Sequence, residues 1–190
     1  MRISFVARAV LAPFVEMARV QAALLRHCIL HWPNTPLGRG LRSGYVRLRA
    51  GSVGKNFLMN TGNSISGYEL LHIGDNCGIA EDCVINLGPG DHQFKMGDGS
   101  FLGPGVFVRT MSHRHDDLET HITKQGYFGA DIILGKEVWV AARCILLPGA
   151  KVGDHCVIAA GSVVSSEIPP YSIVAGNPAR VVRRRAPKGT

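Results

Sequence analysis

Residues 134–164 read LGKEVWVAARCILLPGAKVGDHCVIAAGSVV, and this stretch decides the fold. An aliphatic residue returns at every sixth position without a break, at Leu134, Val140, Leu146, Val152, Ile158 and Val164. An α-helix repeats about every 3.6 residues and a half-buried strand every second residue, so neither explains a step of six. The step predicts a short strand followed by a corner, with three steps closing one triangular coil.

The same step recurs upstream in further registers: Ile73, Ile79 and Ile85; Met96, Leu102 and Val108; and, more loosely, Val53, Met59 and Ile65. The residue after each aliphatic is often glycine or alanine, and the residue four after it is small or β-branched. Aliphatic residues would stack inside the coils while small residues fit the crowded corners. The pattern predicts an all-β fold, a parallel β-helix of hexapeptide repeats in which each coil packs only against its neighbours.

The registers group into about five coils, with a five-residue excess between Ile85 and Met96 and a twenty-residue excess between Val108 and Leu134. Insertions of this kind in a solenoid are expected to be loops, which often carry function. Four cysteines occupy the small-residue slot of the repeat, at Cys77, Cys83, Cys144 and Cys156. We therefore expect them to be packing residues without disulfide bonds.

Three segments are expected along the chain: a helical segment and linker at 1–50, the β-helix at 51–175 with inserted loops 86–95 and 109–133, and a basic tail at 176–190. Residues 1–31 are expected to be helical, with Pro13 kinking or dividing them. The Gly/Arg-rich stretch 32–50 is expected to be a linker. After Glu167, the sequence EIPPYSIVAGNPARVVRRR predicts an exit turn, a last strand and the tail.

The N-terminal helix leaves two interpretations open. Arg8, Arg19 and Arg26 share one helical face, and aliphatic residues fill the rest. We expect the helix to cap the open end of the solenoid or to make oligomer contacts, because a solenoid needs a polar cover at its end. The alternative is a peripheral membrane helix whose arginines meet anionic lipid.

The composition and charge of the 190 residues limit the classes of function. Hydrophobic residues make up 46% and charged residues only 18%, which excludes a disordered chain. The net charge of +7 suggests nucleic-acid binding, but the basic residues lie at the two ends and the region between them is acidic. We therefore expect no nucleic-acid partner. No convincing secretory signal is seen and the cysteines form no CxxC pair, so a cytoplasmic location is expected.

These motifs resemble those of the hexapeptide-repeat acyltransferases, in particular the maltose, galactoside and exopolysaccharide O-acetyltransferases. The resemblance runs from about Val53 to Arg185 and is most specific in three places: GDGSFLGPGVFV followed by Ser112-His113, the stretch 134–164, and PPYSIVAGNPARVVRR. It implies a left-handed β-helix, against the usual right-handed crossover rule. It also implies a homotrimer with active sites between subunits, and acetyl-CoA as the acyl donor.

The resemblance implies that His113 is the catalytic base, since the family places its catalytic histidine where the long loop leaves the coil. Imidazole suits this task because its ordinary pKa of about 6.5 allows it to take a hydroxyl proton at neutral pH. Direct transfer without an acyl-enzyme is implied. His115 is the nearest rival in MSHRHDD. Asp116 could orient an imidazole or bind sugar hydroxyls, although it could equally be a solvated loop charge.

Further site residues are implied by the same resemblance. Asn86 resembles an asparagine that contacts the acceptor, although a turn-capping role explains it equally well. His92 is a weaker acceptor candidate. The expected acetyl-CoA contacts are Ala142, Ala160, Ser165, Ser166, Arg180 and Arg183, where small side chains admit the pantetheine arm and arginines meet phosphate. Relatives often have lysine at the position of Ser166.

The acceptor is expected to be a hydroxyl of a sugar or polysaccharide precursor, although nothing in the two loops specifies one sugar. An antibiotic acetyltransferase of the same fold and a non-catalytic scaffold remain the alternatives. A zinc carbonic anhydrase on this solenoid would need three converging histidines. His92, His113, His115 and His121 all lie in the insertions, so no metal is expected.

Overall fold

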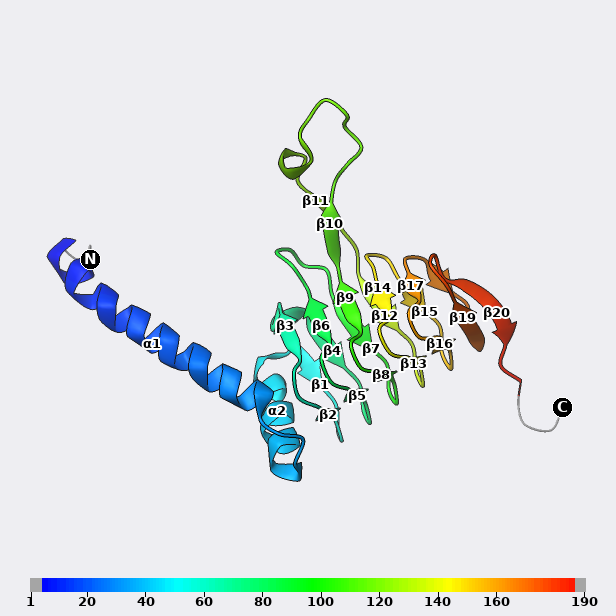
Figure 1. Ribbon diagram of the computed structural model, residues 1–190, viewed down its shortest axis with the longest axis horizontal. Coiled ribbons are helices and arrows are strands. Elements are labelled where there is room, and N and C mark those ends of the chain that lie inside the picture. Colours follow the sequence, from blue (N-terminus) through cyan, green and yellow to red (C-terminus); the bar gives the residue numbers. More distant parts are fainter. Residues whose placement is uncertain (1–4, 187–190) are drawn as a thin grey trace.

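The computed structural model describes residues 5–186, with side chains from Val15 onward, as a triangular parallel β-helix preceded by two helices. Successive strands enter three parallel sheets in rotation (Figure 1). We name them sheet A (β1-β4-β7-β12-β15-β18), sheet B (β2-β5-β8-β13-β16-β19-β20) and sheet C (β17-β14-β9-β6-β3). Each strand therefore pairs with the strand one coil away, as the six-residue repeat predicted.

Five complete coils and a partial sixth make up the solenoid. The strands of the first three coils are β1 (Ser52–Val53), β2 (Leu58–Met59), β3 (Ser64–Ser66), β4 (Leu71–Ile73), β5 (Gly78–Ile79), β6 (Val84–Asn86), β7 (Phe94–Met96), β8 (Phe101–Leu102) and β9 (Phe107–Arg109). Those of the remaining coils are β12 (Ile132–Leu134), β13 (Trp139–Val140), β14 (Ile145–Leu146), β15 (Lys151–Val152), β16 (Val157–Ile158), β17 (Val163–Val164), β18 (Glu167–Ile168) and β19 (Ser172–Ala175). A 3-10 turn, η1 (Tyr68–Leu70), closes the first coil.

The aliphatic residues of the repeat form the core. All six between Leu134 and Val164 are buried, as are those of the registers that begin at Ile73 and Met96. In the loosest register Met59 and Ile65 are buried, whereas Val53 at the open end is only partly covered. The sequence pattern therefore predicted the inward positions correctly.

The corners explain why the repeat has six residues. The third residue after each inward aliphatic has a positive φ in most corners, as at Asn76 (57°), Gly99 (71°) and Arg143 (57°). This left-handed conformation turns the chain sharply from one sheet into the next. This position leaves no signal in the sequence, because glycine, asparagine, aspartate, glutamate and arginine all occupy it.

The other two corner positions pack as expected. A Cβ on Gly97 would lie 2.5 Å from the carbonyl carbon of Gly135 in the next coil, so this position needs a small residue. Cys77, Cys83, Cys144 and Cys156 are buried with free thiols. Burial raises the pKa of all four, that of Cys83 to about 11.

The N-terminal segment differs from the expectation. Helix α1 (Phe5–His31) continues past Pro13, so the chain is not divided there, and the side chain of Arg8 lies outside the described residues. The expected linker is wrong, because α2 (Pro36–Arg49) is a regular helix. Thr35 caps it by accepting a hydrogen bond from the Gly38 amide, and proline occupies its first turn.

Helix α2, rather than α1, covers the open end of the solenoid, while α1 extends away from it (Figure 1). Val46 of α2 is fully buried, and so is Arg42, whose Nε donates to the Met59 carbonyl at 3.0 Å. The other guanidinium nitrogens of Arg42 donate to the carbonyl of Trp32 and the side chain of Asn34. A buried, fully paired arginine therefore closes the first coil.

The C-terminal segment is more ordered than a free tail. Residues Arg180–Arg184 form β20, which pairs antiparallel with β19 at the end of sheet B. Arg184 donates to the Pro170 carbonyl and Arg185 to the His155 carbonyl. The basic residues here thus lie on a strand and partly bind the solenoid itself; Lys188 lies outside the described residues.

Candidate active site on the inserted loops

The longer insertion, 109–133, forms an arm that projects from the solenoid (Figure 1). At its root β10 (Met111–His113) pairs antiparallel with β11 (Tyr127–Gly129). Beyond this hairpin lies a loop with a 3-10 turn, η2 (Ile122–Lys124). The hairpin fixes the direction of the arm, because the Ala130 amide donates a hydrogen bond to the Thr110 carbonyl where the two strands meet the coil.

His113 lies at the outer end of β10, opposite Tyr127 in the hairpin register. The two rings are 4.5 Å apart between centroids and tilted by 36°. The Nδ1 atom of His113 is buried and has no hydrogen-bond partner among the described residues. The tilted Tyr127 ring thus packs against the imidazole, and Nε2, which is not buried and makes no hydrogen bond among the described residues, is the ring nitrogen that a substrate can reach.

His115 and Asp116 are placed differently from His113. Both are exposed, and the Nδ1 atom of His115 lies 3.3 Å from the His113 carbonyl oxygen. The ring of His115 lies near Phe128, which belongs to the face of the hairpin opposite Tyr127, since side chains alternate along a strand. The structure thus separates the two histidines that sequence spacing could not.

Asp116 lines an open hollow of about 320 Å³ near the end of the arm. The neighbouring carboxylate, Asp117, accepts hydrogen bonds from the amides of Glu119 and Thr120. Hydrogen bonds from Thr120 and Glu119 hold the pKa of Asp117 below its usual value. The carboxylates here shape a turn, and no contact between Asp116 and His113 is present.

Asn86 ends β6 and pairs in register with Ser66 on one side and Arg109 on the other. Its side-chain oxygen accepts hydrogen bonds from the Gly88 amide at 3.2 Å and from the Ser66 hydroxyl at 3.3 Å. The turn-capping role is thus present in the structure. It leaves the amide nitrogen of Asn86 without a partner in these contacts.

The two insertions lie against each other, which the sequence could not show. A Cβ on Gly129 would lie 2.3 Å from Cδ2 of His92, and one on Gly88 would lie 2.9 Å from the sulfur of Met111. Nδ1 of His92 lies 4.0 Å from the carboxylate of Asp131. His92 therefore packs on the root of the arm, on the hairpin face that also carries Met111 and His113.

The expected acetyl-CoA contacts fall at the two corners that flank sheet C, one shared with sheet B and the other with sheet A. Ala142 and Ala160 line a groove of about 730 Å³ at the edge between sheets B and C, together with Pro104, Gly105 and Gly161. Ser165 and Ser166 lie exposed between β17 and β18, on the edge where both insertions also leave the solenoid. Within one chain the outer face of sheet C separates these two sets.

Arg180 and Arg183 both lie exposed on β20, at the far end of sheet B. Arg180 donates to the Ala179 carbonyl, whereas Arg183 makes no side-chain hydrogen bond or ion pair among the described residues. Residues three apart normally lie on opposite faces of a strand. Here the pairing of β20 with β19 shifts between Ile173 and Val174, which brings Arg180 and Arg183 to the same face. Their guanidinium groups remain available to an anionic ligand.

The sequence did not point to Tyr127, which packs on His113, or to Met111, which packs on the shorter loop at Gly88. Neither lies in the six-residue register, so no periodic signal marked them. Within the described side chains, no group of three or more His, Cys, Asp or Glu residues is placed to hold a metal ion. None of the described helices has the length and hydrophobicity that a membrane-spanning segment needs.

Comparison with known proteins agrees with this architecture. Residues 131–166 match the family model described as bacterial transferase hexapeptide (six repeats). A Saccharomyces cerevisiae protein named as an acetyltransferase is 32% identical over 157 residues, which cover 82% of this chain and 78% of that protein. The chain belongs to the hexapeptide-repeat acetyltransferases. Its solenoid is the left-handed β-helix of that family.

Solved structures of the hexapeptide-repeat acetyltransferases superpose over most of the chain. A maltose O-acetyltransferase from Clostridium difficile gives a TM-score of 0.75 at 27% identity, covering 89% of this chain and 87% of that one. A galactoside acetyltransferase in complex with coenzyme A gives 0.74 at 26% identity, covering 88% and 80%. An acetyltransferase of Vibrio cholerae, complexed with acetyl-CoA, gives 0.72 at 25% identity, covering 91% and 90%.

Other members of the family match over less of their own length. The aligned region spans 40% of a Mycobacterium tuberculosis protein named as an acetyltransferase, at 32% identity and over 65% of this chain. It spans 59% of a chloramphenicol acetyltransferase from Agrobacterium fabrum, also at 32% identity and over 55% of this chain. The chain thus covers about half the length of these relatives.

Proposed function

We propose that this protein is an acetyl-CoA-dependent O-acetyltransferase that modifies a hydroxyl of a sugar or polysaccharide precursor, with His113 as the general base. The observation that carries the proposal is the position of His113 at the root of the arm, with Nε2 accessible and unpaired and the second insertion packed beside it. Membership of the family supplies the reaction class. An accessible imidazole suits proton removal from a hydroxyl.

In this proposal acetyl-CoA supplies the activated acetyl group. A ring nitrogen of His113 accepts the proton of the acceptor hydroxyl as that oxygen bonds to the thioester carbon. The carbon–sulfur bond then breaks, and the proton held by His113 passes to the departing sulfur. No acyl-enzyme is required, and the four cysteines of the repeat are buried in the solenoid with raised pKa values.

The residues present fit acetyl-CoA. Ala142 and Ala160 leave room for a thin pantetheine arm in their groove, and Arg180 and Arg183 offer guanidinium groups to its phosphates. Ser165 and Ser166 lie on the other edge of sheet C. A homotrimer would bring the two sets of contacts together, because the groove of one subunit would then face the arm of the next.

Two finer proposals concern location. We place the protein in the cytoplasm and propose that α1 makes peripheral contact with the inner face of the membrane. Five apolar side chains of α1 are exposed: Val15, Met17, Val20, Leu24 and Leu25. Three of them, Met17, Val20 and Leu24, share the face opposite Arg19 and Arg26, and a helix with such a face and few acidic residues suits an anionic interface. Flotation with vesicles containing phosphatidylglycerol, compared with phosphatidylcholine vesicles, tests this contact.

An antibiotic acetyltransferase is the second candidate, since relatives include chloramphenicol acetyltransferases and a macrolide acetyltransferase from Lysinibacillus sphaericus that is 40% identical over 116 residues. The experiment that decides is thiol release from acetyl-CoA with free sugars, nucleotide sugars, polysaccharide repeat units, chloramphenicol and a macrolide. We expect release with a carbohydrate acceptor. Release only with an antibiotic favours the second candidate, and no release with any acceptor favours a scaffold.

A further inference from the structure

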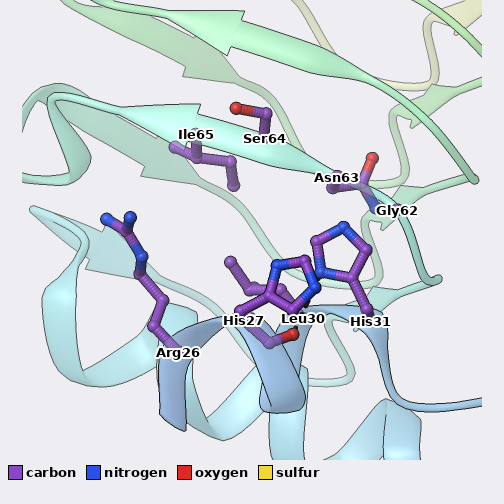
Figure 2. Close-up of a pocket in the computed structure, with 8 residues that line it drawn as sticks. All are labelled: Arg26, His27, Leu30, His31, Gly62, Asn63, Ser64 and Ile65. Carbon is purple, nitrogen blue, oxygen red and sulfur yellow. Dashed lines mark hydrogen bonds between the residues drawn. The ribbon is translucent and has the colours of Figure 1, made fainter. Parts of the chain in front are cut away.

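A pocket outside the site described above lies where the end of α1 meets β3 of the first coil (Figure 2). It has a volume of about 250 Å³ and is lined by Arg26, His27, Leu30, His31, Gly62, Asn63, Ser64 and Ile65. None of these lining residues is acidic, while three of them carry or can carry positive charge. The lining therefore favours an anion.

Arg26 makes no hydrogen bond or ion pair among the described residues, in contrast to Arg19 about two helical turns earlier, which binds Glu16 at 2.7 Å. In Figure 2 the guanidinium of Arg26 extends along β3 toward Ile65, while the rings of His27 and His31 lie at the Gly62 end. Those two rings stack at 4.0 Å between centroids. An unpaired guanidinium thus shares the pocket with two imidazoles.

The backbone contributes a donor as well. β3 is the edge strand of sheet C, and it pairs only with β6. The Ser64 amide donates to the Cys83 carbonyl and the Ser66 carbonyl accepts from Leu87, so both residues bond toward β6. In a parallel pair alternate residues bond to one neighbour, and the amide of Ile65 therefore points away from β6, toward α1. Sheet-edge amides of this kind bind anions.

One carboxylate outside the lining lies at the Gly62 end of the pocket. A Cβ on Gly62 would lie 2.0 Å from an oxygen of Asp82, so this carboxylate lies against the Gly62 turn. Asp82 lines the groove of Ala142 and Ala160 rather than this pocket. Gly62 and Arg26 are at opposite ends of the close-up in Figure 2. An anion would therefore bind at the Arg26 end, beside Ile65.

We propose that this pocket binds an oxyanion, a phosphate or carboxylate, and that the oxyanion is part of the acceptor; the second clause rests on the proposed function. β3 also reaches the acceptor side of the site, since the Ser66 hydroxyl donates to Asn86. β3 and β9, which leads into the arm, are two strand spacings apart, roughly 10 Å. His113 follows β9 on the arm, so an acidic acceptor held by Arg26 would extend across sheet C past Asn86 toward His113.

The first test measures binding without any reaction. Titration of sodium pyrophosphate by calorimetry uses the full chain carrying Arg180→Ala and Arg183→Ala, so that β20 does not contribute. Adding Arg26→Ala should weaken binding about tenfold or more, because a charge-assisted hydrogen bond to the anion is lost. Adding Arg19→Ala instead should leave the affinity unchanged. Equal affinity in the Arg26→Ala and Arg19→Ala proteins would overturn the pocket.

The second test identifies the source of the oxyanion. Acetyl transfer is compared for glucose and glucose 1-phosphate, and for galactose and galacturonate, in the wild type and in Arg26→Ala. The KM for the acidic member of a pair should rise about tenfold while that for the neutral member and kcat stay constant. An equal rise for both members overturns the acceptor clause, and no change in either KM overturns it too and assigns the pocket to free phosphate. Absence of all transfer contradicts the proposed function alone, since the calorimetry still tests the pocket.

Discussion

The solenoid and the arm differ in how much of their side chains they bury and in how their strands pair. In residues 134–164 every sixth side chain is buried in the coil, and every strand except the terminal β17 is bonded to strands on both sides. The arm at 109–133 has an antiparallel hairpin of its own, and Leu118 near its end is 94% exposed. The chain places its candidate base at the junction of the two.

Because of this difference, we expect the coils to determine the stability of the fold and the arm to determine the shape of the site. The coils gain stability from burial and neighbour pairing, so a change in one coil also weakens its packing on the coils above and below. The arm buries little and can change without loss of the core, which suits a segment that shapes a site. Substitutions in the two regions should therefore affect different measured quantities.

The largest expected effect is on turnover. His113→Ala should lower kcat by roughly 10²–10⁴-fold, because the general base is removed. The melting temperature and the affinity for acetyl-CoA should hardly change, since the side chain lies on the arm. Steady-state kinetics and thermal melting measure both. His115→Ala is the matched control, and a loss of turnover in that variant instead would transfer the catalytic assignment to His115.

The next effect is on stability alone. Ile158→Ala removes a fully buried side chain from β16 and should lower the free energy of unfolding by about 2–5 kcal/mol. Denaturant unfolding measures this, with Leu118→Ala on the arm as the control for which little change is expected. At temperatures where Ile158→Ala is folded its kcat should equal that of the wild type. Comparable destabilisation by Leu118→Ala would contradict the separation of the two regions.

A smaller effect is expected at the C-terminal edge of the solenoid. Replacing Arg180 and Arg183 together with alanine should raise the KM for acetyl-CoA about tenfold, because two exposed guanidinium groups no longer meet its phosphates. The KM for the acceptor and kcat should stay constant. A rise only in the acceptor KM would show that the cofactor site was assigned to the wrong edge.

The reactivity of the cysteine thiols should differ between the coils and the helix α1 that extends from them. Cys28 on α1 is exposed, whereas the four cysteines of the repeat are buried and have raised pKa values. Since the thiolate is the reactive form, a thiol reagent at pH 8 should modify Cys28 rapidly and the others only after unfolding. Mass spectrometry of the labelled peptides identifies the sites. Rapid labelling of Cys144 in the folded protein would contradict the packing of the coils.

Stability should also depend on alkaline pH. Burial raises the pKa of Cys83 from 9.0 to about 11, so the fold favours the protonated thiol. This contribution is fully present below pH 9 and is lost as the pH rises toward 11. The free energy of unfolding should therefore fall over this range, and less steeply in Cys83→Ala. An equal slope in both proteins would assign the pH dependence to other groups.

The N-terminal segment shows how local signals can be outweighed. Thr35 and Pro36 are a recognisable helix start, yet the glycines and arginines of 32–50 favoured a linker. The helix forms because its buried face, with Arg42 and Val46, closes the first coil. Tertiary packing overrides weak helix propensity in such a case.

The sequence by itself determined the coils, their inward residues, the small corner positions and the places where the two insertions leave. Each of these follows from a repeat of six residues, a local property that is printed along the chain. Only the tertiary structure brought His92 against Gly129, set Tyr127 over His113, turned His115 to the other face and placed Arg26 beside the edge of β3. These contacts join segments with no common period, so packing alone decides them.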